Sequence, residues 1–421
     1  MTCAISVESH LEPDRTNFST KCDFSRRIVG IIAEFNPFHD GHRYIIDKAK
    51  ELAVNCGGNR EEIAAPKDVK AIQSEDAPVV VSVMSGNFMQ RGEPAVCDKW
   101  TRAKIAVENG VNLVVELPTI YACNSAEFFA KGAVDILEGF GCVDALFFGS
   151  ESGDLKQLVK VAKVLAKNEK EISASANGLL RRGTSYPKAR ESFLGEILGC
   201  EDVGVLREPN NILALEYIKH LKKISPVTIE RKGDAYHVTG TKERRKLKEK
   251  NLSFFAKMEQ NYFNMVATEI LKLEAVRLND FFAVDEGLGN KLKKEIRFTS
   301  NTDELIDVLK SKVYTRTRIS RMLSQILLGI TGEDITGARS YIRILALDKT
   351  GAAFIKEVKK RKYNTIPIIT NINRGLENNP QIAATIEKDV LAADIYNLIT
   401  GNSLYDCSDY IKKPFIKGIN T

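Results

Sequence analysis

Short apolar runs recur along the first 230 residues, and longer segments with one apolar face lie between them. The runs are almost wholly apolar and rich in β-branched residues, which is typical of strands covered on both faces. They lie at 28–33, 79–84, 111–117, 143–148 and 227–229. The segments with helical spacing lie at 41–52, 99–110, 125–141, 154–166, 185–198 and 210–222. This alternation predicts an α/β fold, a doubly wound parallel sheet with helices on both faces.

Beyond residue 250 the apolar periodicity becomes helical. The amphipathic segments lie at 254–272, 302–309 and 318–328, and a short strand is predicted at 366–370. We therefore expect a polar N-terminal extension at 1–27, an α/β domain at 28–250 and a second, mostly helical C-terminal domain at 251–421. Within the α/β domain, the polar stretch 55–77 has no clear period and is predicted to be a surface insertion.

The first predicted strand runs directly into a turn that contains two histidines. Asn36-Pro37 breaks the strand pattern, and helical spacing resumes at Gly41. A helix N-terminus carries free backbone N–H groups and partial positive charge, which suit phosphate. His39 and His42 can point the same way and donate hydrogen bonds to charge on phosphate oxygens. Two surface histidines in a loop are the alternative, but two of the chain's five histidines directly follow its best strand.

Three polar segments, 36–42, 85–92 and 149–152, directly follow predicted strands. Because ligands of open parallel sheets bind beyond the carboxyl ends of the strands, we expect these segments to surround one cavity. Gly149 would allow close approach to a base or ribose, although a plain turn glycine explains it equally well. Arg231 and Lys232 follow the last predicted strand and would present cations to the same crevice, where they suit phosphate.

Charge is divided unevenly along the chain. Residues 1–230 hold 28 Lys and Arg against 32 Asp and Glu, a net charge of −4, and residues 231–421 hold 33 against 23, a net charge of +10. A basic half favours a polyanion such as RNA, although a solvated basic face is a common alternative. Arg316, Arg318 and Arg321 gather at a predicted helix start beside Tyr314, a composition that suits RNA backbone and exposed bases.

His39-Asp40-Gly41-His42 resembles the HxGH signature of the adenylyl-transferring α/β superfamily, which includes class I aminoacyl-tRNA synthetases and small-molecule adenylyltransferases. The wider match is closer. Residues 30–42, 85–94, 148–152 and 209–213 together resemble the bacterial tRNA(Met) cytidine acetate ligase family, and the similarity spans most of 28–232. That family uses ATP to activate acetate, then acetylates the wobble cytidine of elongator methionine tRNA.

The resemblance implies a nucleotidyltransferase fold of the HxGH type, with ATP as co-substrate and Mg²⁺ carried by the nucleotide. It implies catalytic roles for His39 and His42, acetate and elongator tRNA(Met) as further substrates, and RNA contacts in the basic C-terminal half, for which Arg316, Arg318 and Arg321 are the candidates. The residues expected to bind ATP are Ile32, Ala33, Glu34, Phe35, Asn36, Pro37, Phe38, His39, Asp40, Gly41, His42, Arg43, Tyr44, Ile45, Gly149, Asn210, Asn211, Arg231 and Lys232.

Two parts of this site keep alternative interpretations. Asn210 and Asn211 stand at the first turn of a predicted helix, where asparagine is a common cap, so one can cap while the other binds ATP. Residues 238–244 resemble a weak version of the second phosphate motif of adenylyltransferases, Ile-Ser-Ser-Thr-x-x-Arg, but Glu243 stands where an apolar residue is usual. A solvated basic segment explains 238–250 as well.

Other classes of protein are disfavoured by composition. No window approaches the ~18 apolar residues of a membrane helix, and the start of the chain lacks the pattern of a signal peptide, so we expect a cytoplasmic protein. The eight cysteines form neither a CxxC pair nor a zinc-ligand spacing, so we expect reduced thiols, no disulfide partner and no protein-bound metal.

Two rival functions remain: an adenylyltransferase for a phosphorylated metabolite, and an RNA-binding protein with a relict nucleotide site. A true aminoacyl-tRNA synthetase is disfavoured because the chain has no Lys-Met-Ser-Lys-Ser loop.

Overall fold

Eight strands form one sheet in this computed structural model, which describes residues 26–55, 77–172, 186–197, 200–231, 240–284 and 287–418. The strand order is β5-β4-β1-β2-β3-β6-β7, and β8 pairs with β6. The first five strands run parallel; they are β1 (Ile28–Ala33), β2 (Val79–Ser85), β3 (Leu113–Leu117), β4 (Ala145–Ser150) and β5 (Ser225–Glu230). All five occupy the predicted apolar runs, and the predicted doubly wound α/β sheet is confirmed.

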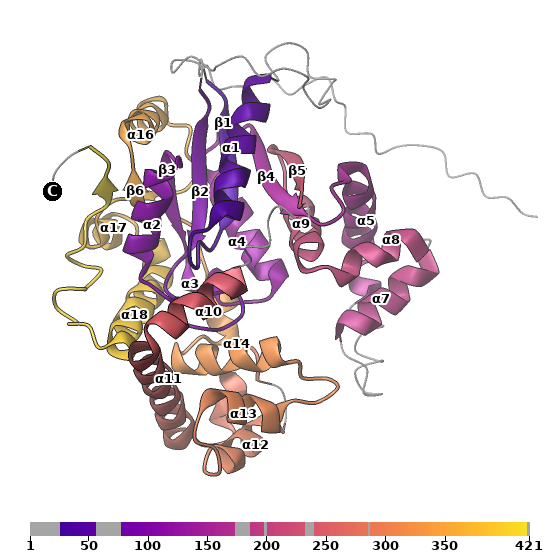
Figure 1. Cartoon of the computed structure of the whole chain (residues 1–421), viewed down its shortest axis with the longest axis vertical. Helices are drawn as coiled ribbons and strands as arrows, with labels where there is room; N and C mark the ends of the chain where they lie inside the picture. Colours follow the sequence, from indigo (N-terminus) through magenta and orange to yellow (C-terminus); the bar gives the residue numbers. More distant parts are fainter. Residues whose placement is uncertain are drawn as a thin grey trace, which may run out of the picture.

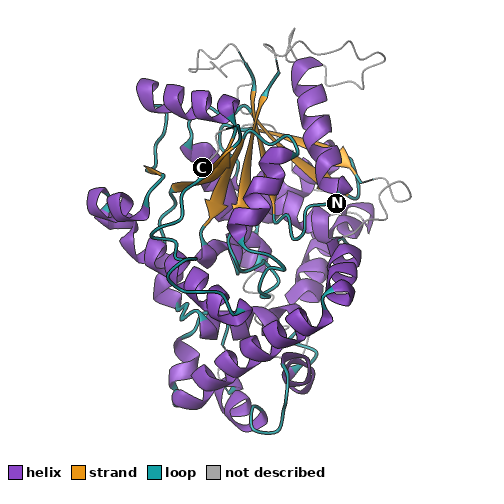
Figure 2. Ribbon diagram, turned by 60° about the vertical axis from the view of Figure 1, so that its left-hand side comes forward, coloured by secondary structure: helices purple, strands orange, loops and turns teal. Residues whose placement is uncertain are grey.

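Helices cover both faces of the sheet, as Figures 1 and 2 show. On one face lie α1 (Asp40–Asn55) and α2 (Lys99–Glu108). On the other lie α4 (Ala126–Gly139), α5 (Leu155–Lys167), α9 (Pro209–His220) and α16 (Lys349–Arg361). Three further helices, α3 (Thr119–Ala122), α7 (Tyr186–Ile197) and α8 (Cys200–Gly204), lie in the connections between these elements. Two covered faces explain why most of these strands have runs of consecutive apolar residues rather than apolar residues at alternate positions.

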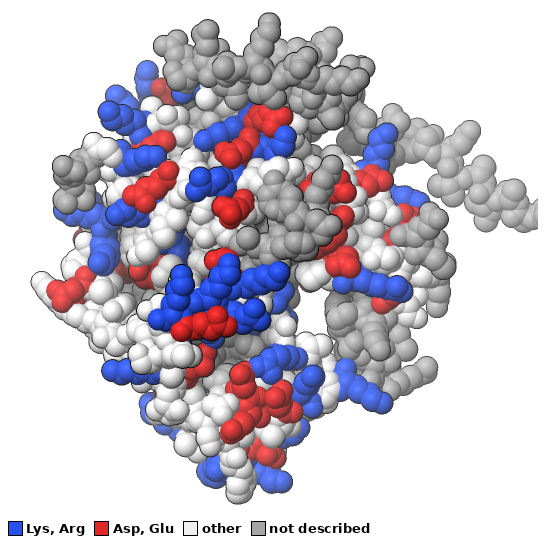
Figure 3. All heavy atoms as spheres, in the orientation of Figure 1, with Lys and Arg blue, Asp and Glu red and all other residues white. Residues whose placement is uncertain are grey.

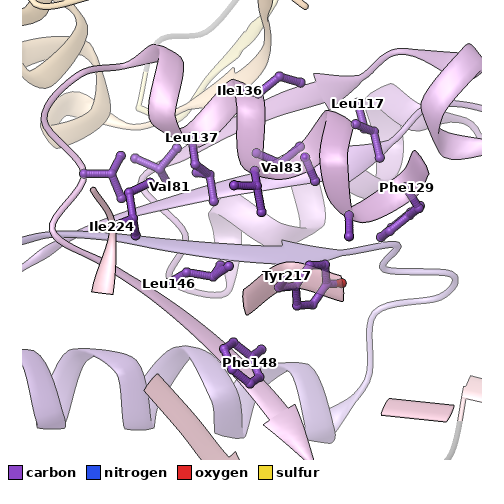
Figure 4. Close-up of a cluster of buried hydrophobic side chains, with 14 of the residues drawn as sticks. Val81, Val83, Leu117, Phe129, Ile136, Leu137, Leu146, Phe148, Tyr217 and Ile224 are labelled. Carbon is purple, nitrogen blue, oxygen red and sulfur yellow. The ribbon is translucent and has the colours of Figure 1, made fainter. Parts of the chain in front are cut away.

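The core beneath the second face joins strands and helices that are far apart in sequence. Side chains of β2, β4, α4 and α9 point toward one another in Figure 4, among them Val81, Val83, Leu137, Leu146 and Tyr217. Gly30 in β1 lets α4 approach closely, because a Cβ there would lie 2.8 Å from Leu137 Cδ1. This packing fixes the carboxyl ends of the parallel strands, beyond which the site lies.

The C-terminal half begins as a helical layer. Its helices are α10 (Gly240–Lys250), α11 (Leu252–Lys272), α12 (Leu288–Glu295), α13 (Thr302–Leu309), α14 (Arg316–Leu327) and α15 (Gly332–Gly337), and α17 (Ile372–Asn378) and α18 (Ala383–Thr400) follow later in the chain. The helices predicted at 254–272, 302–309 and 318–328 are present. Their apolar faces pack with Phe88, Met89 and Ile120 from the first half, so the two halves share a core.

The chain then returns to the sheet, which differs from the expected separate unit at 251–421. β6 (Ile342–Leu347) pairs antiparallel with β3, and β7 (Ile368–Ile369) and β8 (Phe415–Ile416) pair with β6. The physical reason is that all six residues of β6 are buried and all but Arg343 are apolar, so the backbone groups of the strand need a neighbouring strand as partner. β7 is the short strand predicted at 366–370. Residues from both sides of position 250 therefore build one sheet.

A buried cluster of charges lies where β3 meets β6. Lys99 Nζ donates to Glu116 at 2.7 Å and to Asp409 at 2.6 Å. Arg343 Nη1 donates to the same two carboxylates at 2.9 and 2.8 Å. All four side chains are almost wholly buried, so each charge depends on the others for its stability. We call these four residues the junction cluster.

Several expectations fall outside the described residues: nearly all of the extension 1–27, residues 56–76 of the insertion predicted at 55–77, Lys232, and the first two residues of the motif 238–244. Among the helices of the described ranges, none is long and apolar enough to cross a membrane. Cys97, Cys123, Cys142 and Cys407 are free thiols.

Candidate nucleotide site at the carboxyl ends of the strands

The two histidines stack on each other at the start of α1. Their ring centroids lie 3.8 Å apart, with 25° between the ring planes. The N–H of Gly41 donates to His39 Nδ1 at 3.1 Å, and the N–H of His39 donates to His42 Nδ1 at 3.2 Å. Because each Nδ1 accepts a hydrogen bond, each neutral ring carries its proton on Nε2. The turn therefore presents two Nε2–H donors, and the predicted pairing of the histidines is present.

Burial holds both imidazoles in the neutral form. It lowers the pKa of His39, with the charge of Arg231 as the next cause. Burial also lowers the pKa of His42 well below its ordinary value, assisted by His39 and Arg231. Desolvation penalises the charged form of an imidazole, so both rings are neutral hydrogen-bond donors at pH 7.

The backbone of this turn offers fewer free amides than a helix start usually does. The N–H groups of His42 and Arg43 donate to the carbonyl of His39 at 2.9 and 3.3 Å, and the Gly41 amide already bonds His39 Nδ1. The free N–H groups expected at this helix N-terminus are therefore partly used within the turn itself. The Nε2–H groups of the two histidines take part in none of these hydrogen bonds.

Residues before the histidines tie the turn to the loop after β2. The Asn36 side-chain oxygen accepts the Val96 N–H at 2.9 Å, across a cis Asn36–Pro37 bond from the histidines. Glu34 Oε1 accepts the Gln90 N–H at 2.7 Å, and burial raises the pKa of Glu34. Phe35, at a positive φ of 46°, sets its ring against that of His42 with centroids 5.0 Å apart. The segments that follow β1 and β2 are thus in contact with each other, and the cavity expected between the three polar segments stays a prediction.

Arg102 holds these two loops from behind, and sequence reasoning missed it. Its fully buried guanidinium donates to the carbonyl oxygens of Glu34 at 2.7 Å, Ser85 at 3.1 Å and Cys97 at 2.9 Å, and also to that of Gly86. An arginine in an amphipathic helix is usually on the solvent side. Arg102 lies on the same face of the helix 99–108 as Ala103, Ala106 and Val107, and this position in the sequence could have predicted its burial.

The opposite side of the site is built by Glu151 and the start of α9. The carboxylate of Glu151 accepts the Asn210 side-chain amide at 2.5 Å and the Asn211 N–H at 2.8 Å. Asn211 Oδ1 in turn accepts the N–H of Glu151 at 2.9 Å, and Asn210 Oδ1 accepts from Arg231 Nη1 at 3.2 Å. The capping interpretation of the two asparagines is wrong, because Glu208 is the N-cap residue and makes no side-chain cap bond.

Gly149 lies within β4 rather than in a turn. A Cβ there would come within 3.2 Å of Arg231 Cγ and 3.6 Å of Ile45 Cδ1. The glycine therefore leaves room for the Arg231 side chain to cross the strand toward Asn210. Arg231 is exposed and directly follows β5, as predicted.

The start of α10 closes the histidine side of the site. Arg244 Nη1 donates to the Asn36 carbonyl at 2.9 Å, and a Cβ on Gly240 would lie 3.7 Å from His39 Nε2. The described part of the weak phosphate motif, 240–244, thus lies against the histidines. The alternative, a solvated basic segment, describes the rest of α10, none of whose residues is buried.

The three arginines predicted to bind RNA lie differently from one another on α14. Arg316 forms ion pairs with Asp303 and, at 3.1 Å, with Asp307. The Arg318 guanidinium lies over the Tyr314 ring, 5.0 Å from its centroid. Arg321 is partly buried, and the pKa of its guanidinium is lowered by that burial. Arg316 and Arg318 are thus held by neighbouring residues.

A parallel sheet that presents paired Nε2–H donors and two arginines beyond its strand ends defines a nucleotidyl transferase site. The family model described as HIGH Nucleotidyl Transferase matches residues 26–56 and 68–409. Within that class, the chain belongs to the tRNA(Met) cytidine acetate ligase family. Its relatives of that name in Thermoanaerobacter sp. and Clostridium novyi are 35% and 34% identical; the matches cover 93% and 92% of this chain, and 99% and 98% of theirs.

A solved structure supports the same assignment. Thermotoga maritima TmcAL, crystallised with alpha-thio ATP, is 27% identical and matches with a TM-score of 0.79 over 93% of this chain and 99% of its own. A second crystal form of that protein, without nucleotide, gives a TM-score of 0.78. The fold is thus one that accommodates an ATP analogue in a relative of full length.

Proposed function

We propose that this protein is an ATP-dependent ligase that activates acetate as acetyl-adenylate and acetylates the N4 amine of the wobble cytidine of elongator tRNA(Met). The names of its relatives and the ATP analogue bound to a structural neighbour support this reaction. The single observation in this chain that carries it is the pair of neutral Nε2–H donors on His39 and His42, with Arg231 and Arg244 beside them. Substrates of this kind imply a cytoplasmic protein.

In the first step, an acetate oxygen bonds to the α-phosphorus of ATP while the bond to the β-phosphate oxygen breaks. Acetyl-adenylate and pyrophosphate result. Negative charge grows on the phosphate oxygens, and His39 and His42 stabilise it through Nε2–H. Arg231 and Lys232 hold the leaving pyrophosphate, and the side chains from Ile32 to Ile45, with Gly149, Asn210 and Asn211, complete the ATP site.

In the second step, the N4 amine of cytidine bonds to the acetyl carbon, the bond from that carbon to the AMP oxygen breaks, and N4 loses one proton. The chemistry needs no nucleophilic side chain, since positioning and electrostatics carry both steps. Arg316, Arg318 and Arg321 are retained as candidates for RNA contact.

Magnesium would reduce the charge of the polyphosphate and so assist the attack on phosphorus. In the described ranges, no three residues among His, Cys, Asp and Glu gather as ligands for a resident ion. We infer that ATP itself would hold the ion, while Arg231 and the two imidazoles would bind the remaining phosphate oxygens.

Mass spectrometry of tRNA nucleosides after incubation with ATP and acetate tests this proposal. We expect N4-acetylcytidine in elongator tRNA(Met) only when protein, ATP and acetate are all present. Pyrophosphate exchange that requires a phosphorylated metabolite instead of acetate would support the small-molecule adenylyltransferase. Tight RNA binding without any exchange would support a relict nucleotide site.

A further inference from the structure

Helix α10 lies against the nucleotide site yet buries none of its residues. Its 11 residues include six Lys and Arg and two Glu. A helix that is polar on all sides gains little from core packing, so something other than burial accounts for its composition. Arg244 anchors it to the Asn36 carbonyl, and Leu247 makes a partly buried contact with the helical core.

The remaining cations of α10 face solvent. Arg245, Lys246 and Lys248 have side chains that are 74%, 60% and 43% exposed. They pair with Glu249 at 3.6 Å, Glu243 at 2.7 Å and Glu259, respectively. Exposed ion pairs contribute little to stability, so a polyanion can replace the carboxylates at little cost. Figure 3 shows the resulting cluster of Lys and Arg at the place where Figure 1 labels α10.

We propose that the outer face of α10 docks the phosphate backbone of the RNA substrate and so delivers the wobble base to the His39–His42 site. The inference rests on the proposed function, because it takes tRNA as the second substrate. The helix is about 16 Å long, a length over which one nucleic-acid strand carries roughly four or five phosphates. Because Arg244 fixes the helix to the histidine turn, a strand lying on α10 ends beside the nucleotide.

The other basic elements fit this role less well. On α14 only Arg316 is exposed, since Arg318 and Arg321 are partly buried, whereas α10 exposes several cations. The basic end of α16 is exposed, but it lies at the opposite end of the molecule from α14 in Figure 1, with the sheet between them and α10 on the α14 side. Lysines of α16 therefore provide a control variant that loses the same number of positive charges.

The test compares two triple variants. The first carries Arg245→Gln, Lys246→Gln and Lys250→Gln on α10, which removes three positive charges and keeps good helix formers. The control carries Lys356→Gln, Lys359→Gln and Lys360→Gln on α16. Each is titrated with unmodified tRNA(Met) at several salt concentrations, and acetate-dependent pyrophosphate exchange is measured without RNA. Circular dichroism checks that both variants fold.

We expect the α10 variant to bind tRNA about tenfold more weakly at low salt. The slope of log affinity against log salt should flatten by about two units, since each lost phosphate contact removes roughly 0.7. Exchange should be unchanged in both variants, and the control should bind as the wild type does. Unchanged affinity and slope in the α10 variant, or an equal loss in the control, would overturn the inference.

The outcomes separate this inference from the proposed function. If the wild type shows no acetate-dependent exchange, the acetate reaction is wrong, whatever α10 does. If exchange is present but falls in the α10 variant while tRNA binding holds, α10 belongs to the ATP site and not to RNA docking.

Discussion

Both imidazoles use Nδ1 to hold their own turn, which leaves Nε2 as the chemical end of each ring. The spacing of His39 and His42 is readable in the sequence, and their pairing was predicted from it. The tautomer of the two rings was not predicted. It depends on the N–H groups of Gly41 and His39, and where those groups point is set by the folded turn. The same holds for Arg102, whose partners are carbonyls of three separate segments.

Replacing either histidine should separate the roles of its two nitrogens. We expect His39→Ala or His42→Ala to lower the exchange rate by about 100-fold or more, the scale of one lost oxyanion donor. A Gln side chain places its amide nitrogen near the position of Nε2, whereas Asn places it near Nδ1. His42→Gln should therefore retain more activity than His42→Asn. Steady-state exchange kinetics with circular dichroism measures this, and equal activity of the two variants would contradict the assigned tautomer.

Stability should fall on the acid side because of these two rings. Their pKa values in the folded protein lie below the ordinary 6.5, so the unfolded chain binds protons first as pH falls. Their contribution is fully present above pH 6.5 and is lost as pH drops toward the lowered folded values. Urea unfolding at pH 7.5 and 5.5 should show a smaller loss for His42→Gln than for the wild type. An identical pH dependence would argue against a buried neutral His42.

At the scale of elements, a helix of the C-terminal half supports a loop of the site. The hydroxyls of Ser320 and Ser324 on α14 both donate to the Gly92 carbonyl at 2.9 Å. The segment 85–92 was predicted to reach the site from its place after a strand. Its contact with α14 joins positions 228 and 232 residues apart, which no local pattern encodes. Charge reversal at Arg321 would therefore affect the site loop as well as any RNA contact.

Gly92 is the sharpest test of this contact. Its φ is +81°, and a Cβ there would lie 2.3 Å from the Arg321 Cα, so Gly92→Ala must displace either the loop or α14. We expect lower thermal stability and at least a tenfold lower exchange rate, since small displacements of positioning groups are costly. Gly332→Ala, where a Cβ would meet nothing within 4 Å, is the control and should behave as the wild type. A normal exchange rate for Gly92→Ala would show that α14 does not position the loop.

At the scale of the whole molecule, the five parallel strands were predictable because each is an apolar run bounded by polar turns. The run Ile342–Leu347 has the same character, but sequence periodicity does not reveal that its partner is β3, far back in the chain. The expected division at 250 followed from composition, which changes there. The extent of the sheet depends instead on which strands pair, and the pairing of β3 with β6 joins residues from both sides of position 250.

Removing one member of the junction cluster should destabilise the whole protein. Asp409→Ala would leave Lys99 and Arg343 buried with a single carboxylate, which costs about 3–5 kcal/mol of the free energy of unfolding. Asp406→Ala, at an exposed position three residues earlier, is the matched control and should change it by under ~0.5 kcal/mol. Urea unfolding of the purified variants measures both, and similar values would mean that the cluster does not stabilise the fold.

The distance in sequence between Asp409 and the first five strands also sets the order of events during synthesis. Translation is vectorial, so β1 to β5 leave the ribosome long before β6 and Asp409 exist. Until then the edge of β3 that pairs with β6 is open, Lys99 lacks Asp409 and Glu116 lacks Arg343. The nucleotide site can therefore mature only after residue 409 has been synthesised. A nascent chain stalled before residue 409 should remain sensitive to protease throughout, including in its catalytic half.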